Sequence, residues 1–355
     1  MTSRERMLTA LRGQQPDTVP VFLRDLTLGM DITGYSTPEV CAGGPNGGYD
    51  AEKSAQSVVA CWERFGHDCV VGSIQDLAMD VEALGGTSAF PERGIPRVAT
   101  APFADKEMLE GARVPQMQSD GRLPGVFASY GLVKERIGSE VAIAANVEGP
   151  VTKAGALRGM ERLMLDLVDD PQFARRLVSF AAEISVSHIH ALAEAGADFI
   201  FVAAAADGPA VIGPEIYRGY TIPNLRRLVE AAQAGGIPLV FHPHGPFTDQ
   251  RFWPLVDAAV EVGIDGFQFG ENCDLGVAKR RWGKEIAILG GVDMPTVLFP
   301  GPPEAIRQAT AACIEQAAGD GGYVLMPSCS LHRGAPVDHI QVMMVAARQF
   351  GRCHG

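Results

Sequence analysis

Gly236-Ile-Pro-Leu-Val-Phe-His-Pro-His244 is a short apolar run that ends in two histidines. Its continuous rather than alternating apolarity is typical of a strand that is buried on both faces, as in a parallel sheet covered by helices. In a strand, residues i and i+2 point the same way and lie roughly 6.5 Å apart. Both imidazoles can therefore close on one metal ion, although a His-x-His pair taken alone is as readily an ordinary loop feature.

Apolar runs of this kind recur along the chain, and helical patterns separate most of them. Eight strands interleaved with helices predict an α/β fold, the (β/α)8 TIM barrel, in a single domain over residues 1–355. We expect strands at residues 18–24, 67–72, 141–146, 198–203, 237–242, 265–269, 286–291 and 322–327. We expect helices at residues 2–12, 52–65, 171–194, 214–234, 250–262, 302–318 and 336–350.

Two segments are too long to be simple barrel loops. Residues 25–50 are rich in glycine and proline, and residues 73–125 are longer still. Structureless loops of this length are uncommon in compact domains. We therefore expect N-terminal insertions over the barrel mouth, with a lid function as a hypothesis.

The composition limits the classes of function. Of 355 residues, 46% are hydrophobic and 20% are charged, which allows a sizeable core. A formal charge of -12 without an extended basic cluster argues against a nucleic-acid partner. The chain shows no signal-peptide pattern at its start and no apolar run approaching a membrane span, so we expect no membrane partner. Seven scattered cysteines indicate a reduced, cytoplasmic protein.

A cysteine joins the two histidines as a candidate ligand. Cys329 follows the expected strand at 322–327. In a TIM barrel the functional groups project from the carboxyl ends of the strands, so His242, His244 and Cys329 are expected to converge. Two imidazoles and one thiolate, with a fourth position left for solvent or substrate, form a typical catalytic zinc site. We therefore predict that these three residues bind Zn²⁺.

Five other polar residues end expected strands. Glu271 and Asp293 follow two strands next to the histidines, and we predict a catalytic role for both. Glu271 could be a fourth ligand, a base or a solvated loop carboxylate. Glu148, Asp207 and Arg24 close three other strands and are predicted to bind polar or anionic groups of the ligand or cofactor. A structural turn or ion pair explains each of these three residues equally well.

The remaining histidines and cysteines are interpreted as structural. Cys273 and His332 lie near the candidate ligands in sequence, but we consider them bystanders. His188 and His190 fall inside an expected helix, where residues i and i+2 face apart. His67 precedes a strand and is interpreted as a turn residue.

Several motifs spread over nearly the whole chain are specific when taken together. They are Arg4-Glu-Arg-Met-Leu-Thr-Ala-Leu-Arg-Gly13, Val147-Glu-Gly-Pro-Val-Thr152, Ala193-Glu-Ala-Gly-Ala-Asp198, Leu289-Gly-Gly-Val-Asp293, Leu298-Phe-Pro-Gly301, Met326-Pro-Ser-Cys329 and Ala335-Pro-Val-Asp-His-Ile340. With them the chain resembles the uroporphyrinogen decarboxylase superfamily and, within it, the cobamide-dependent zinc methyltransferases that methylate thiols such as coenzyme M. The resemblance implies methyl transfer between a corrinoid (cobalamin) and a zinc-activated acceptor.

The resemblance also assigns the ligands. Those methyltransferases hold zinc with a His-x-Cys pair and a later cysteine, so His242 matches the first ligand and Cys329 the third, whereas His244 stands where the family has cysteine. A neutral imidazole in place of a thiolate raises the site charge by one unit and makes zinc a stronger Lewis acid. A bound thiol would then deprotonate more readily but attack less strongly. The acceptor therefore need not be coenzyme M.

Other functions remain open at this point. A decarboxylase acting on a porphyrinogen needs several basic partners, yet the first expected strand continues as Arg24-Asp-Leu-Thr-Leu-Gly29 instead of an Arg-Gln-Ala-Gly-Arg segment. A zinc enzyme of another kind, such as one that adds a thiol to an epoxide or cleaves a C–S bond, is a further alternative, as is a non-catalytic binding barrel. The corrinoid-binding Asp-x-His-x-x-Gly pattern does not occur in the sequence, so a separate corrinoid protein is the expected partner.

Overall fold

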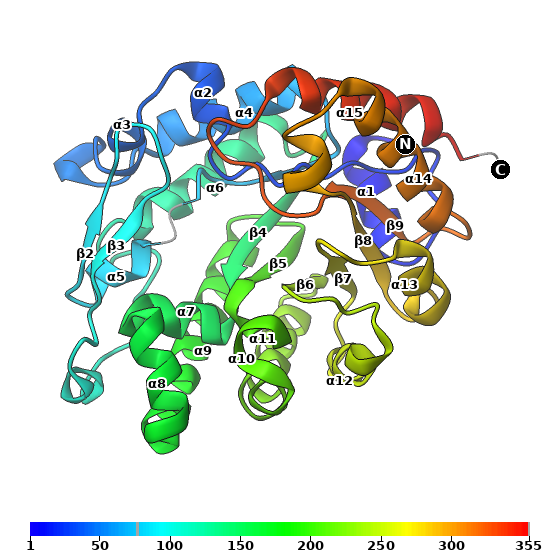
Figure 1. Cartoon of the computed structure of the whole chain (residues 1–355). Helices are drawn as coiled ribbons and strands as arrows, with labels where there is room; N and C mark the ends of the chain where they lie inside the picture. The colour runs from blue at the N-terminus through cyan, green and yellow to red at the C-terminus, as the bar shows by residue number, and fades with distance from the viewer. Residues whose placement is uncertain (76–77, 354–355) are drawn as a thin grey trace.

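The computed structural model describes residues 1–75 and 78–353. One parallel sheet has the strand order β1-β4-β5-β6-β7-β8-β9. Its strands are β1 (Cys69–Val71), β4 (Ala142–Glu148), β5 (Phe199–Ala204), β6 (Leu239–Pro243), β7 (Gly266–Phe269), β8 (Ala287–Val292) and β9 (Tyr323–Pro327). The sheet curls into a barrel with helices outside it (Figure 1), which confirms the predicted fold class. Seven of the eight expected strands coincide with these elements.

The eighth expected strand, residues 18–24, is not a regular strand. It forms isolated bridges, among them one between Phe22 and Cys69 of β1. The N–H of Phe22 also donates to the carbonyl of Leu325 in β9 at 3.0 Å. A regular ladder is interrupted because Pro20 has no N–H to donate. The segment nevertheless lies between the two edge strands and closes the barrel.

The interior of the barrel is apolar toward the amino ends of the strands. Helix α1 (Ser3–Leu11) begins with the expected capping box of Thr2 and Glu5. Its buried side chains pack into the barrel interior in a cluster that includes Met7, Ala10, Leu11, Phe22, Phe199, Phe201, Val240, Leu289, Val324 and Met326. Because α1 closes this end with apolar contacts, a polar site is left to the carboxyl end.

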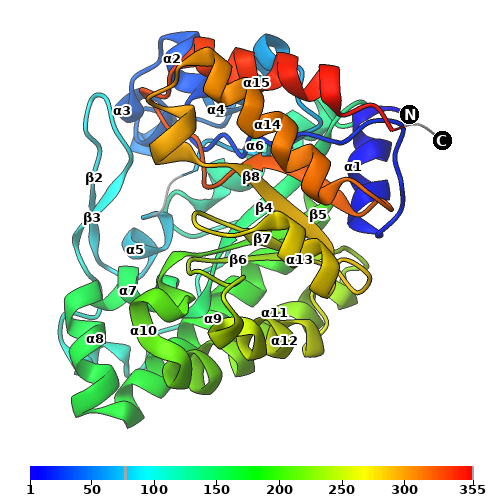
Figure 2. The ribbon, with the colours of Figure 1, turned by 45° about the vertical axis from the view of Figure 1, so that its right-hand side comes forward.

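Helices cover the outside of the barrel (Figure 2). They are α4 (Ala51–Phe65), α6 (Leu123–Ile137), α7 (Pro150–Arg158), α8 (Met160–Asp169), α9 (Pro171–Glu194), α10 (Pro209–Ile216), α11 (Ile222–Ala234), α12 (Trp253–Glu261), α13 (Leu275–Trp282), α14 (Pro303–Ala317) and α15 (Val337–Phe350). The helix expected at 214–234 is instead the end of α10, a π-helical turn at Tyr217–Thr221 and α11. Pro223 cannot donate the hydrogen bond that a continuous α-helix requires.

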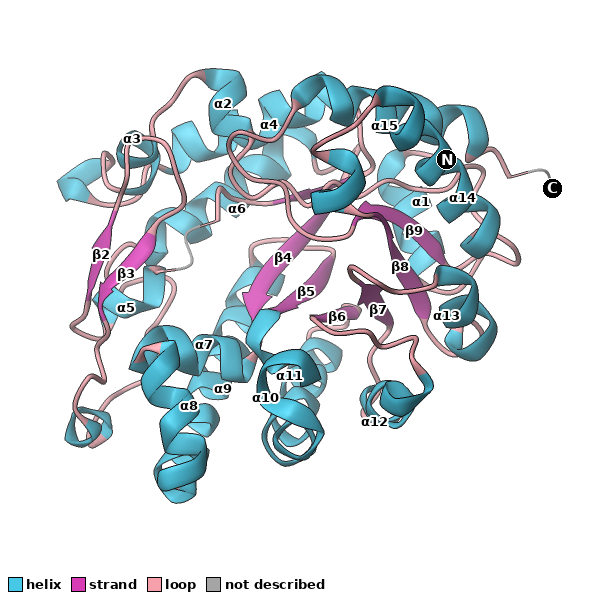
Figure 3. Ribbon diagram, in the orientation of Figure 1, coloured by secondary structure: helices cyan, strands magenta, loops and turns pink. Residues whose placement is uncertain are grey.

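The two long insertions contain short elements of their own. Residues 25–50 form α2 (Gly29–Thr33), α3 (Thr37–Cys41) and a 3₁₀ turn at Pro45–Gly47. Of residues 73–125, positions 76 and 77 lie outside the described residues, and the others include α5 (Met79–Ala83), the hairpin β2 (Thr87–Ala89) and β3 (Arg97–Thr100), and a 3₁₀ turn at Lys106–Leu109. In Figure 3 the hairpin lies on the side toward which β4 points, at the barrel mouth.

Two further features agree with the composition. All seven cysteines are free. Within the ranges that the structure describes, none of the helices is both long and apolar enough to cross a membrane.

Candidate metal centre

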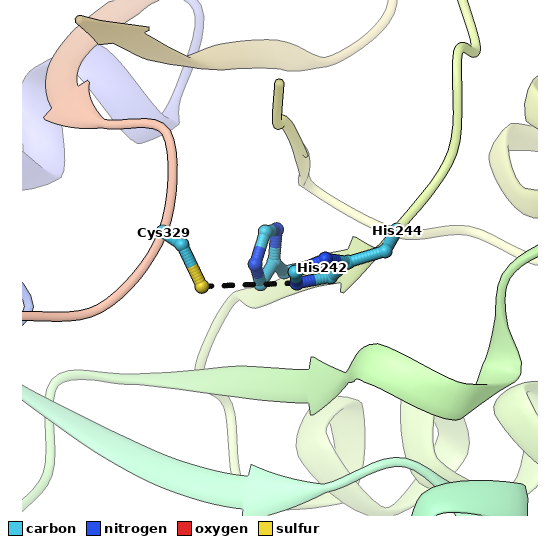
Figure 4. A group of neighbouring side chains, drawn as sticks. All are labelled: His242, His244 and Cys329. Carbon is cyan, nitrogen blue, oxygen red and sulfur yellow. Dashed lines mark hydrogen bonds between the residues drawn. The ribbon is translucent and has the colours of Figure 1, made fainter. Parts of the chain in front are cut away.

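His242, His244 and Cys329 converge at the carboxyl end of the barrel (Figure 4). His242 is part of β6 and His244 follows it, whereas Cys329 lies just beyond β9. One nitrogen from each imidazole and the Sγ atom of Cys329 all lie within 4.8 Å of one another. The Sγ atom is 3.8 Å from Nε2 of His244, and the two ring centroids are 4.8 Å apart. Strand alternation places both rings on the same side, as the His-x-His spacing predicted.

The buried His242 ring is oriented by its neighbours. The residue is 1% exposed, and its Nδ1 atom lies 3.5 Å from the backbone carbonyl of Gln268. A proton on Nδ1 is then directed at that carbonyl, which leaves the lone pair on Nε2. Among the described residues Nε2 has no hydrogen-bond partner. A buried polar atom without a partner is costly, so this nitrogen fits a metal ligand held by the usual backbone contact.

The electrostatics favour the metal-binding protonation states of His242 and Cys329, but act against the neutral form of His244. Burial lowers the pKa of His242 to about 4, which keeps its ring neutral. Burial would raise the pKa of the Cys329 thiol, but the neighbouring imidazoles of His242 and His244 and the charge of Arg24 outweigh it and lower that pKa. The hydrogen bond with Cys329 raises the pKa of His244. A thiolate with two imidazoles is a donor set that suits zinc.

Arg24 is a fixed positive charge beside these groups. It has a left-handed backbone with φ +46, and its Nε and Nη2 atoms donate to Oδ1 of Asn146 at 3.2 and 3.0 Å. Its guanidinium lies 4.4 Å from the ring centroid of Phe201. Burial lowers the pKa of Arg24 to about 10, while the Cys329 thiolate acts in the opposite direction. The side chain therefore stays charged near the candidate ligands.

The structure separates the two residues predicted to be catalytic. Glu271 faces the cluster, with Oε2 at 4.0 Å from Nδ1 of His244 and Oε1 accepting a hydrogen bond from Ser328 at 3.0 Å. Asp293 instead accepts hydrogen bonds from the backbone N–H and the hydroxyl of Thr296, at 2.9 and 2.6 Å. It thereby caps a π-helical turn. Across residues 1–75 and 78–353, no hydrogen bond or ion pair joins Asp293 to the three candidate ligands.

Glu148 and Asp207 lie at the ends of β4 and β5, but their carboxylates have structural partners. Asp207 is fully buried and accepts hydrogen bonds from the N–H groups of Val151 and Thr152, both at 2.9 Å, which caps α7. Burial raises its pKa. Glu148 pairs with Nζ of Lys153 at 2.6 Å. The described contacts do not bring either carboxylate to the three candidate ligands.

The residues interpreted as bystanders have mixed positions. The thiol of Cys273 donates to the carbonyl of Gly245 at 3.5 Å. His188 is buried and His190 is exposed, on opposite sides of α9. His67 lies in the connection between α4 and β1, and its side chain is buried. His332, by contrast, forms a hydrogen bond with Ser330, the residue after Cys329.

Two buried amide side chains near the site, Asn146 and Gln268, were not predicted from the sequence. Asn146 binds Arg24, while Gln268 donates to the carbonyls of Pro327 and Ser328 at 3.1 and 3.3 Å and so anchors the chain before Cys329. Atoms Nδ2 of Asn146 and Oε1 of Gln268 lack partners among the described residues. An isolated amide within an otherwise apolar strand was the available signal, because such a strand buries few polar groups without a reason.

A parallel α/β barrel with two histidines and a cysteine gathered at its mouth defines a barrel protein with a candidate metal centre. The family model named uroporphyrinogen decarboxylase (URO-D) matches residues 2–350. The chain therefore belongs to the uroporphyrinogen decarboxylase family, as its motifs predicted.

Relatives within this family include two kinds of enzyme. The chain is 25% identical to the methylcobamide:CoM methyltransferase MtaA of Methanosarcina barkeri, over 98% of each chain. It is also 25% identical to the uroporphyrinogen decarboxylase of Alkalilimnicola ehrlichii, over 97% of this chain and 93% of the relative. The solved structure of a methyltransferase from Methanosarcina mazei is similar with a TM-score of 0.84 and 26% identity, covering 99% of both chains. The chemistry of the site must therefore separate the two activities.

Proposed function

We propose that this protein is a zinc-dependent methyltransferase that moves a methyl group between a corrinoid, carried by a separate protein, and a thiol acceptor. The convergence of His242, His244 and Cys329 within 4.8 Å carries this proposal. Decarboxylation gives no reason for two imidazoles and a thiolate to share one point. The similarity to methyltransferases supports the same conclusion.

The donor set determines what the centre would hold. His242, His244 and Cys329 would bind zinc and leave a fourth position for substrate. Bound zinc lowers the pKa of a coordinated acceptor and so makes its anion available near neutral pH. Glu271, 4.0 Å from His244, lies at the edge of the site and is placed to take the proton that the acceptor loses.

The charges at the candidate metal centre favour an anionic acceptor. One thiolate among the ligands, instead of the two that the resemblance implies, leaves the centre one unit more positive. Arg24 adds a buried cation that interacts with Cys329. A negatively charged group on the acceptor would compensate for this field, and the Arg24 guanidinium offers it charge-assisted hydrogen bonds. Seven free cysteines suit the reducing cytoplasm in which we place the protein.

The first test is the metal content of the purified protein by elemental mass spectrometry. We expect about one zinc per chain, lost in His242→Ala and in Cys329→Ala. Cys273→Ala is the matched control, since it removes a nearby thiol that bonds a backbone carbonyl instead. Methyl transfer from free methylcobalamin to small anionic thiols, followed by the cobalamin spectrum, should be lost together with the metal.

A wild-type protein that remains metal-free after reconstitution with zinc would contradict this proposal. Conversion of uroporphyrinogen by that metal-free protein would then favour the decarboxylase alternative. Retention of zinc in both Cys329→Ala and His242→Ala would place the metal elsewhere and remove the observation on which the proposal rests.

A further inference from the structure

A chain of hydrogen bonds reaches Cys329 from the loop after β9. The hydroxyl oxygen of Ser330 lies 3.8 Å from Sγ of Cys329. Nε2 of His332 lies 2.9 Å from that oxygen, and Oγ1 of Thr27 lies 3.3 Å from Nδ1 of His332. The first insertion is therefore connected to the sulfur of a candidate metal ligand through two side chains.

Only one direction of donation fits a Cys329 that binds metal. A coordinating thiolate has no proton and can only accept, so Ser330 must donate to it. The Ser330 oxygen then accepts from Nε2–H of His332, and Nδ1 accepts from the hydroxyl of Thr27. The oxygen of Thr27 in turn accepts the N–H of Arg333 at 3.0 Å. A neutral imidazole satisfies this pattern, and burial lowers the pKa of His332 to about 4.

The loop that carries this chain is fixed to the first insertion. Nε of Arg333 donates to Oδ1 of Asp31 at 2.9 Å, and the N–H of Gly334 donates to Oδ2 of the same residue at 2.7 Å. Ser330 itself is 5% exposed. The backbone is also held on both sides of Ser330, since Gln268 donates to the carbonyl of Ser328 and the N–H of Leu331 donates to the carbonyl of Arg24 at 3.2 Å. These hydrogen bonds fix the position of the Ser330 hydroxyl beside the sulfur. Residues 27–31 thus hold the loop at residues 328–334, which contains Cys329, in place.

We propose that Ser330 and His332 are positioning residues of the metal centre: Ser330 donates a hydrogen bond to the Cys329 sulfur, and His332 fixes the direction of that hydroxyl. This inference rests on the proposed function, because it takes Cys329 as a metal ligand. A hydrogen bond to a thiolate withdraws electron density from sulfur and leaves the metal more Lewis acidic. The effect has the same direction as the neutral imidazole at His244. Both features would therefore lower the pKa of an acceptor bound at the centre.

Cobalt(II) makes this hydrogen bond measurable, because it occupies tetrahedral zinc sites and shows a sulfur-to-metal charge-transfer band. The full-length protein reconstituted with cobalt should show such a band, and Cys329→Ala should abolish it. In Ser330→Ala the band should move to longer wavelength, since the sulfur lone pairs rise in energy without the donor. His332→Phe should move it less, in the same direction. Zinc affinity measured against a chelator should fall about tenfold in Ser330→Ala.

Two variants separate this role from a general loss of packing. Ser328→Ala truncates the serine on the other side of Cys329, whose hydroxyl bonds Glu271 instead of the sulfur, and should leave the band in place. Ser330→Thr retains a hydroxyl and should restore the wild-type band. An unmoved band in Ser330→Ala, or an equal shift in Ser328→Ala, would overturn the inference alone. A wild-type protein that binds neither cobalt nor zinc would overturn it together with the proposed function.

Discussion

Two groups of titratable side chains at the barrel mouth are satisfied in different ways. In the first group, Lys153 forms ion pairs with both Asp80 and Glu148, and Asp80 also lies 3.0 Å from His188. The side chains of these four residues are at most 10% exposed. They are partners for one another, and they tie α5 of the second insertion to β4, α7 and α9.

The second group, His242, His244 and Cys329, is arranged around a common point instead. It has no buried ammonium or carboxylate at its centre, and Nε2 of His242 lacks a hydrogen-bond partner within the part of the chain that the structure describes. The comparison teaches that burial and clustering alone do not identify a ligand site. A cluster whose opposite charges form ion pairs with one another holds the fold, whereas one whose ligand atoms converge within 4.8 Å of one another suits a metal ion.

The largest effect on stability is expected from breaking the first group. Lys153→Met leaves Asp80 and Glu148 buried without their cation, and should lower the free energy of unfolding by about 3–5 kcal/mol. Urea denaturation of the purified protein measures it. Lys106→Met is the matched control, because Lys106 is 38% exposed, its partner Asp170 is exposed, and its buried partner Asp166 keeps a second cation in Arg158. Its cost should stay below about 1 kcal/mol, and an equal cost for both lysines would contradict the distinction.

A smaller effect tests a buried imidazole that is far from either group. His67 is 1% exposed, its Nδ1 has no partner among the described residues, and burial lowers its pKa to about 3. Its unfolded pKa is near 6.5, so the stability that it contributes is present above pH 6.5 and is lost as the pH falls below that value. Between pH 6.5 and 5 the loss should be about 2 kcal/mol. Unfolding measured across this range should be flatter in His67→Gln, and parallel curves would show that His67 is not the group responsible.

The smallest effect on stability is expected for a metal-free substitution in the second group. His242→Leu removes the unpartnered Nε2 and a single long hydrogen bond, from Nδ1 to the carbonyl of Gln268 at 3.5 Å. In the presence of a chelator its stability should therefore lie within about 1 kcal/mol of the wild type. Added zinc should stabilise only the wild type, by about 2.7 kcal/mol when its concentration is one hundred times the dissociation constant. Thermal unfolding with and without zinc gives both values. A large loss of stability in the metal-free variant would show that His242, like Lys153, holds the fold together.

Local sequence features predicted the frame of the molecule. The apolar runs marked seven strands correctly, because a strand between two helical layers must be apolar on both faces. The His-x-His spacing placed two imidazoles on one side of β6, since side-chain direction repeats every two residues. The capping box of Thr2 and Glu5 marked the start of α1 for an equally local reason. The strand expected at 18–24 was wrong as a regular element, because Pro20 interrupts the ladder.

The use of each polar group was decided by tertiary structure. Asp207 and Asp293 follow strands just as Glu271 does, yet the first two cap helical segments and only Glu271 faces His244. The hydrogen-bond chain from Thr27 to Cys329 joins positions about three hundred residues apart, a separation no local pattern spans. Sequence by itself therefore determined the strands and the meeting of the two histidines with Cys329. Which groups stay free for a ligand depends on partners that the folded chain brings from distant segments.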